Sequence, residues 1–421
     1  MKTKSKTTGY IVHSIAAAML ILTPQISLAG SATWLSSPQD SAWENANNWT
    51  AGGPPNGPSD IATFAHSSQT DVNVSTVEEV SSLVFTSNSD PFTLNISPYG
   101  AFGGELIISG TGVINNNTVL QTFETRNRGQ IIFNNASTAA SAHMSILNGG
   151  AYPPEDSTGQ TIFNDRSSAG GASIANASAE VDFYGDIGRT IFNGASTADH
   201  ASISNHGPGG SHGVGGQTTF NDTSTAANAS IDNGGSGSVS TAEGSLTIFN
   251  DTSSAGRATI TNHGGDFGGV TIFTDSSSAD SAILIAYGAM YGSGAILFHG
   301  ASTGGTARVE VFDNAYLDIT GHQSGLTIGS IEGSGNVHLG ANRLTVGTRN
   351  INTSFSGVIS GSGSLAKVGS GVLTLQSNHC IADTVGLILV TGSIIKLDFT
   401  GPSDAIASLK VNAPSLRQAT A

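Results

Sequence analysis

Four aspartates recur at the same place in a repeated sequence pattern, each two residues after a phenylalanine: Asp165, Asp222, Asp251 and Asp275. A column of carboxylates could bind calcium through its oxygens, or attack a glycosidic bond if two of them faced each other across the substrate. Because these acids follow the repeat instead of interrupting it, we interpret them as solvated turn residues. A carbohydrate-active enzyme would need acids to converge with an arginine such as Arg166, Arg189 or Arg257.

Histidines are the second set of candidate ligands, and they stand at His143, His200, His206, His212, His263 and His299. Only His206 and His212 lie close in sequence, and no spacing of Cys, His and Asp matches a structural zinc site. The stretch 264–269 is similar to a calcium-binding glycine-rich nonapeptide, but it occurs once, whereas such sites need repetition. We therefore expect no metal-binding residue and no cofactor.

Nucleophilic catalysis has equally little support in the sequence. No Gly-x-Ser-x-Gly elbow lies between a strand and a helix. Cys380 is the only cysteine, so no intrachain disulfide can form. His379 precedes it, but adjacent residues of a strand do not share a face. We predict no catalytic and no cofactor-binding residues.

The elements that carry all these residues form a repeat. An Ile-Phe-Asn segment or a close relative recurs at spacings of 30, 29, 28, 29, 24 and 25 residues, with its aromatic residue at Phe133, Phe163, Phe192, Phe220, Phe249, Phe273 and Phe298. A second apolar marker follows each phenylalanine by 10 to 13 residues, at Ile146, Ile174, Ile203, Ile231, Ile260, Ile283 and Val309. Two markers in step over seven units indicate a repeat architecture.

Each unit has the pattern of short strands. In 229–233 and 258–262, Ala, Ile and Asn fall on alternate positions and so share one face of an extended strand. Units this short bury an apolar face only by stacking on copies of themselves. We predict an all-β fold, a single-stranded parallel β-helix (β-solenoid) with about 24–30 residues per coil. Whether the phenylalanine or the neighbouring isoleucine points inward stays open.

The composition narrows the class of function. The 421 residues include 15 Lys and Arg against 30 Asp and Glu, a formal net charge of −15, which leaves no basic face for nucleic acid. Disorder is disfavoured because 38% of the residues are hydrophobic. The 55 glycines fit the sharp corners of stacked coils.

The N-terminus predicts export. Lys2, Lys4 and Lys6 precede an apolar run at 15–22, and small residues at 27–29 offer a cleavage site. We interpret 1–29 as a secretory signal peptide. No later segment is long and apolar enough to span a membrane, so we expect no transmembrane helix in the mature chain.

Two stretches carry a family resemblance. The segment 32–64 holds all three tryptophans, and 355–375 carries Gly-x-Gly, a lysine and Gly-x-Gly-x-Leu-x-Leu in order. Both are similar to secreted bacterial proteins with autotransporter-associated β-strand repeats. The pattern departs from that family after Leu375, where Cys380 replaces the usual aromatic residue. The resemblance implies a parallel β-helix passenger that is displayed at the cell surface or released from it.

We therefore expect a signal peptide (1–29), an N-terminal β-rich cap with the first coils (30–120), a solenoid array (121–320), C-terminal coils that include the family repeat at 355–397 (321–400) and a tail (401–421). The expected function is that of an exported, non-enzymatic protein for surface display, adhesion or matrix contact. Glycans or cell-surface components are its expected partners. A polysaccharide lyase or glycoside hydrolase on the same fold, and a truncated relic of a larger passenger, remain alternatives.

Overall fold

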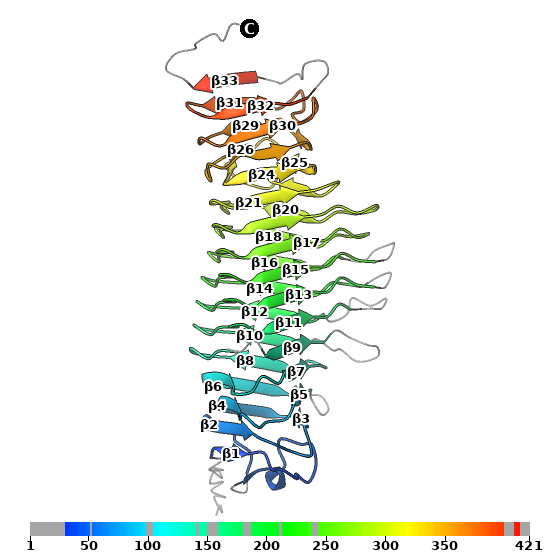
Figure 1. Cartoon of the computed structure of the whole chain (residues 1–421), viewed down its shortest axis with the longest axis vertical. Coiled ribbons are helices and arrows are strands. Elements are labelled where there is room, and N and C mark those ends of the chain that lie inside the picture. Colours follow the sequence, from blue (N-terminus) through cyan, green and yellow to red (C-terminus); the bar gives the residue numbers. More distant parts are fainter. Residues whose placement is uncertain are drawn as a thin grey trace, which may run out of the picture.

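The computed structural model describes residues 30–50, 53–97, 104–139, 143–149, 159–179, 187–209, 213–237, 243–399 and 408–412. These residues form an elongated stack of coils, in which each turn of the chain adds one layer (Figure 1). The predicted parallel β-solenoid is thereby confirmed. The predicted signal peptide at 1–29 lies outside the described residues.

Two sheets of 14 strands run the length of the described stack, and neighbouring strands in each are parallel. The first sheet consists of β1 (Ala32–Thr33), β2 (Gly57–Phe64), β4 (Val77–Phe85), β6 (Glu105–Asn115), β8 (Gln130–Phe133), β10 (Gln160–Phe163), β12 (Arg189–Phe192), β14 (Gln217–Phe220), β16 (Leu246–Phe249), β18 (Val270–Phe273), β20 (Ala295–Phe298), β22 (Tyr316–Asp318), β25 (Asn336–His338) and β28 (Val358–Ser360).

The second sheet consists of β3 (Asp71–Val74), β5 (Thr93–Ile96), β7 (Gln121–Thr125), β9 (Met144–Asn148), β11 (Ser173–Asn176), β13 (Ser202–Asn205), β15 (Ser230–Asn233), β17 (Thr259–Asn262), β19 (Ile283–Ala286), β21 (Arg308–Val311), β24 (Ser330–Gly333), β27 (Thr353–Phe355), β30 (Val372–Leu375) and β32 (Ile394–Leu397).

The third side of the stack changes along its length. In the repeat array it is a column of single-residue bridges, such as those of Thr197 with Ser168 and with Thr225. Towards the C-terminus a five-stranded sheet forms, made of β23 (Leu326–Ile328), β26 (Arg343–Val346), β29 (Ser364–Lys367), β31 (Gly386–Val390) and β33 (Ser408–Asn412). β33 lies within the expected tail at 401–421 and pairs with β31, so part of that tail adds a strand to the stack.

The phenylalanines point inward, which settles the orientation that the sequence left open. In β10, Thr161 and Phe163 are buried, whereas Gln160 and Ile162 face outward and are half-buried. Parallel in-register pairing places each ring on its copy, with centroids 4.7 to 4.8 Å apart from Phe133 to Phe298. One part of the core is therefore a continuous column of stacked phenylalanine rings.

The second marker of the repeat forms an apolar column in the second sheet, and in one unit the inward residue differs from the predicted one. Ile146, Ile174, Ile203, Ile231 and Ile260 are buried and in register. In the sixth unit the prediction of Ile283 is wrong, because Leu284 pairs with Ile260 and takes the inward place, while Ile283 is half-buried on the outer face. Both residues are apolar, so spacing alone did not distinguish them.

The change of repeat length is confined to one corner. The loop between β15 and β16 covers 234–245, that between β17 and β18 covers only 263–269, and that between β19 and β20 covers 287–294. The strands and the opposite turn keep their lengths. The shortened corner loops therefore account for the drop in spacing after Phe249.

The N-terminal end is closed by tryptophans. Trp34, Trp43 and Trp49 are all buried, and Trp49 lies 4.8 Å from Trp43 and 5.7 Å from Phe64, measured between ring centroids. A short 3-10 helix, η1 (Ala46–Asn48), carries the chain between them. Among the described residues, no helix is long and apolar enough to cross a membrane.

Candidate functional site

The recurring aspartates occupy a turn with left-handed backbone conformation. Their φ angles are 57° for Asp165, 55° for Asp222 and 53° for Asp251 and Asp275. Asn135, Gly194 and Gly300 hold the same place in other coils, with φ of 58°, 65° and 62°. Glycine, asparagine and aspartate are the residues that tolerate this conformation. Backbone geometry therefore explains why an acid recurs here.

Each aspartate also binds the coil before it. The carboxylate of Asp165 accepts a hydrogen bond of 2.9 Å from the backbone N–H of Asn135, and that of Asp222 accepts one of 2.8 Å from Gly194. Asp251 and Asp275 repeat this contact on the backbone of Asp222 and Asp251. The acids are exposed, as expected for turn residues, and they tie neighbouring coils together.

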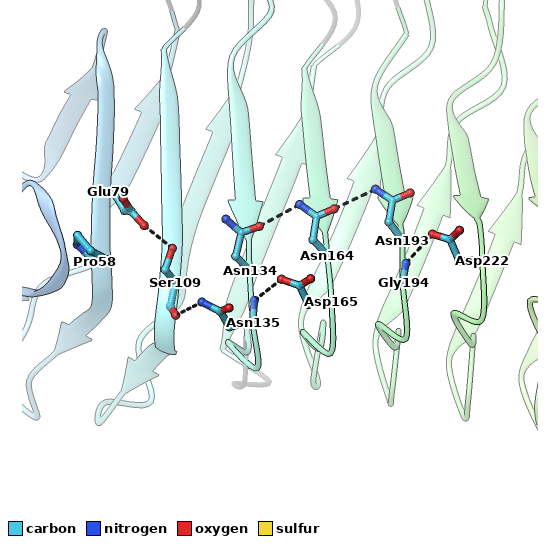
Figure 2. Close-up of a pocket in the computed structure, with 10 residues that line it drawn as sticks. All are labelled: Pro58, Glu79, Ser109, Asn134, Asn135, Asn164, Asp165, Asn193, Gly194 and Asp222. Atoms are coloured by element: carbon cyan, nitrogen blue, oxygen red, sulfur yellow. Dashed lines mark hydrogen bonds between the residues drawn. The ribbon is translucent and has the colours of Figure 1, made fainter.

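Two of the four aspartates line a shallow polar trough of about 800 Å³ on the outside of the stack (Figure 2). It runs across β2, β4 and β6 and the turns that follow β8, β10, β12 and β14. Its lining residues are Pro58, Glu79, Ser109, Asn134, Asn135, Asn164, Asp165, Asn193, Gly194 and Asp222. Apart from Pro58 and Gly194, every side chain in the polar trough is a hydrogen-bonding group, which suits a ligand rich in hydroxyl groups.

A ladder of asparagines forms one wall of the trough. The amide of Asn164 donates to Asn134 over 2.9 Å, and that of Asn193 donates to Asn164 over 3.0 Å (Figure 2). An asparagine amide has two N–H donors, and the ladder uses one of them. Among the described residues, Asn164 and Asn193 have no partner for the second, so donors repeat at about the 4.8 Å strand spacing.

The arginines named from the sequence do not join these acids. Arg166 and Arg257 are exposed, Arg189 begins β12 at the opposite end of the strand from the trough, and none of the three lines it. Gly194 separates Asp165 from Asp222 in the column. The polar trough thus lacks the convergence of acids and arginine that an enzyme on this fold was expected to need.

The histidines are also dispersed. His200 pairs with Asp199 and His263 with Asp232, each at 2.6 Å, and both pairs are largely exposed. His206 is exposed, His299 is half-buried, His143 lies before β9, and His212 lies outside the described residues. Within the described part of the chain, no group of three or more His, Cys, Asp or Glu side chains is placed to hold a metal ion.

The side chains of His379 and Cys380 diverge. Cys380 is fully buried and its Sγ donates to the backbone oxygen of Phe355 over 3.4 Å, whereas His379 is exposed. The thiol therefore packs inside the stack, away from the neighbouring imidazole.

One cluster of charges was missed by the sequence analysis. On the outer face of the second sheet, the guanidinium of Arg308 donates to Glu332 through Nε over 2.6 Å and through Nη2 over 3.0 Å. Its Nε also lies 2.9 Å from Glu310. Burial raises the pKa of Glu310, although Arg308 opposes that shift. The outward phase of Arg308 and Glu310 in one strand is visible in the sequence, but the pairing with Glu332 in the next coil is not.

Two buried charges lie nearer the ends of the stack. Burial raises the pKa of Glu78 to about 7, and the nearby Glu44 carboxylate adds to the shift. Glu78 shares the inward phase of Val80, which is a signal that the sequence does carry. Near the C-terminus, Lys367 is also buried, its Nζ donates to the oxygen of Val368 over 2.6 Å, and burial lowers its pKa.

Comparisons of the chain with protein-family models, with curated proteins and with solved structures find no match.

Proposed function

We propose that this protein is an exported, non-enzymatic β-solenoid whose sides make weak, repeated contacts with glycans or other surface components. The observation that carries the proposal is the polar trough. Its asparagines and aspartates use part of their hydrogen-bonding capacity to join coils, and the remainder is available to a polyhydroxylated chain. Export rests on the predicted signal peptide at 1–29.

Repetition supports contact more than catalysis. Equivalent donors and acceptors recur from coil to coil, so a glycan chain lying along the stack can engage several at once, and linked weak contacts raise the overall affinity. A hydrolase needs one carboxylic acid whose pKa is raised by its surroundings. The turn acids of the trough, Asp165 and Asp222, are both exposed to solvent.

The test fills the trough with a residue type that this turn accepts elsewhere. A Cβ on Gly194 would lie 3.0 Å from the backbone oxygen of Asp165, so that coil has to shift slightly. Gly194→Asn places a side chain between Asp165 and Asp222, and the φ of 58° at Asn135 shows that asparagine is accepted in this column. Gly300→Asn is the matched control, because Gly300 holds the same turn position with φ of 62° and does not line the trough. Retention of the secreted chain on a panel of immobilised neutral polysaccharides is expected to fall for Gly194→Asn alone.

Equal retention of both variants, or no retention of the unmodified chain on any glycan, would refute glycan contact through the trough. Circular dichroism of both variants checks that the stack persists.

A carbohydrate-active enzyme is the second candidate, and the Arg308 cluster favours it. Glu310 and Glu332 are register partners on neighbouring coils, so their backbones lie about 4.8 Å apart. In such an enzyme Glu310, whose pKa is raised, would be the protonated general acid, and Glu332 would be the ionised carboxylate on the other side of the glycosidic bond. Glu332 also lines a small hollow of about 310 Å³ with Asn352, Thr353 and Thr374.

Release of reducing ends from the same polysaccharides decides between the candidates. Cleavage that is abolished by Glu310→Gln or Glu332→Gln, but not by Asp251→Asn, would establish the enzyme and overturn the non-enzymatic proposal. We expect no cleavage, because the guanidinium of Arg308 already occupies both carboxylates.

A further inference from the structure

Another hollow lies at the opposite end of the first-sheet strands from the polar trough. This corner cleft has a volume of about 360 Å³ and forms where the corner loops shorten. Its lining residues are Glu243, Gly244, Leu246, Asp266, Phe267, Gly268, Val270, Gly292, Ser293 and Tyr316. None of them lines the polar trough, so the corner cleft is a separate feature of the surface.

The floor of the corner cleft is apolar because one outward column changes its residue type. The first residues of successive strands are in register, and those of β10, β12 and β14 are Gln160, Arg189 and Gln217. The column continues with Leu246, Val270 and Tyr316, and with Ala295, which is fully buried and does not line the cleft. The column becomes apolar in the coils where the long corner loops are replaced by short ones. The short loops leave this apolar surface uncovered.

Glycines let the corner loops stack closely around this floor. A Cβ on Gly244 would lie 2.0 Å from the backbone oxygen of Gly268, and a Cβ on Gly268 would lie 2.0 Å from that of Ser293. Side chains at these two positions are therefore excluded, and the loops stay packed. The walls next to them carry Phe267, whose side chain is 43% exposed, and the carboxylates of Glu243 and Asp266.

The charge of the corner cleft has one sign. Its lining residues include two acids and no base, in a chain of net charge −15. An aromatic face attracts a cation, and carboxylates nearby add to that attraction. Apolar walls with few polar groups suit a small organic ligand. A bare metal ion fits poorly, since hard cations prefer a shell of oxygen ligands.

We propose that the corner cleft binds an organic ammonium group, such as a methylated amine, with Tyr316 and Phe267 against its apolar surface and Glu243 and Asp266 opposite its charge. This proposal does not depend on glycan contact through the polar trough. A neutral sugar on the same aromatic side chains is the competing occupant, and the experiment separates the two by charge.

Choline is the probe, and 3,3-dimethylbutan-1-ol is its uncharged counterpart of the same shape. Calorimetric titration of the unmodified chain is expected to show binding of choline, weakened by added salt, and at least about tenfold weaker binding of the alcohol. Equal binding of both, or no binding of choline, overturns the proposal. Binding of glucose or cellobiose in place of choline assigns the corner cleft to sugars and overturns it as well.

Matched variants locate the binding. Glu243→Gln, Asp266→Asn and Tyr316→Leu are each expected to weaken choline binding several-fold. Their controls are Asp232→Asn, an exposed acid paired with His263, and Tyr287→Leu, an exposed tyrosine that does not line the corner cleft. Because Glu243 is exposed, its variant keeps the stack intact even if Tyr316→Leu does not. Choline binding that is unchanged by Glu243→Gln and Asp266→Asn contradicts the assignment.

Discussion

At the residue scale, buried asparagines order this stack alongside the aromatic column. Asn205 is fully buried, donates to Asn233 over 2.8 Å, and accepts from Asn176 over 2.7 Å and from Thr218 over 2.9 Å. A buried amide left without partners costs about 1–3 kcal/mol. Each asparagine of this inner ladder therefore favours the coil register in which its copies align.

Glu78 is a residue whose ionisation opposes folding. It is 3% exposed, Thr76 donates to Oε1 over 2.6 Å, and Oε2 has no hydrogen-bond partner among the described residues. Its pKa is about 7 in the folded chain and about 4.3 in an unfolded one. Between these values folding takes up a proton, so stability falls as the pH rises towards 7 and stays low above it.

We predict that Glu78→Gln removes this pH dependence. At pH 8 the variant is expected to be more stable than the unmodified chain by up to about 3 kcal/mol, and at pH 4 the two converge. All three tryptophans lie in the N-terminal cap, so tryptophan fluorescence during thermal unfolding reports on this region alone.

The neighbouring Glu79→Gln serves as the control, since Glu79 faces outward and accepts a hydrogen bond from Ser109. If the difference in stability between Glu78→Gln and the unmodified chain is the same from pH 4 to pH 8, the raised pKa of Glu78 is not the cause of the pH dependence.

At the scale of the element, the turns fix the coil more tightly than the strands do. From β10 to β21 the strands have four residues each, so their ends depend on corners of defined conformation. One corner keeps a positive φ in six consecutive coils, at Gly170, Asp199, Ala227, Gly256, Asp280 and Gly305. Alanine is the least suited of these residues, because its Cβ crowds the following carbonyl in the left-handed region.

We predict that Ala227→Gly stabilises the protein by about 1 kcal/mol, because it relieves a φ of 51° at that corner. Ala301→Gly, at an exposed alanine without a positive φ, is the control and is expected to lose about 0.5–1 kcal/mol. Midpoints of urea unfolding measure both changes. A loss of stability for Ala227→Gly would show that its backbone is unstrained.

At the scale of the whole molecule, the two ends of the described stack differ. Tryptophans cover the first coil, whereas β32 and β33 are the last strands of their sheets and carry exposed apolar side chains. Ile394 is 51% exposed, Leu397 62% and Leu409 58%. Strand edges of this kind pair readily with other chains.

We predict that the double variant Ile394→Lys and Leu397→Lys reduces concentration-dependent association, measured by sedimentation velocity, because charged edge strands resist pairing. Val77→Lys is the control: Val77 is 50% exposed, but its strand β4 is paired on both sides. Association that persists in the double variant, or that Val77→Lys reduces equally, contradicts a role for this edge.

The repeat made much of this architecture predictable. Because each unit buries its apolar residues only against its copies, the spacing of Phe133 to Phe298 led directly to parallel stacked coils. The turn position of the acids followed from the small polar residues around them. The choice of Leu284 over Ile283 did not follow, since a shift of one residue in a strand exchanges its faces and both candidates are apolar.

The sequence by itself determined the fold class, the coil length and the turn position of the aspartates, since all three depend on contacts between equivalent residues of successive repeats. Only the tertiary structure decided the inward direction of the phenylalanines, the meeting of Arg308 with Glu332, and the hollows on the surface. These depend on where residues from different coils meet around corners of unequal length. Periodicity specifies which residues stack, but the shape of the corners specifies which side chains converge.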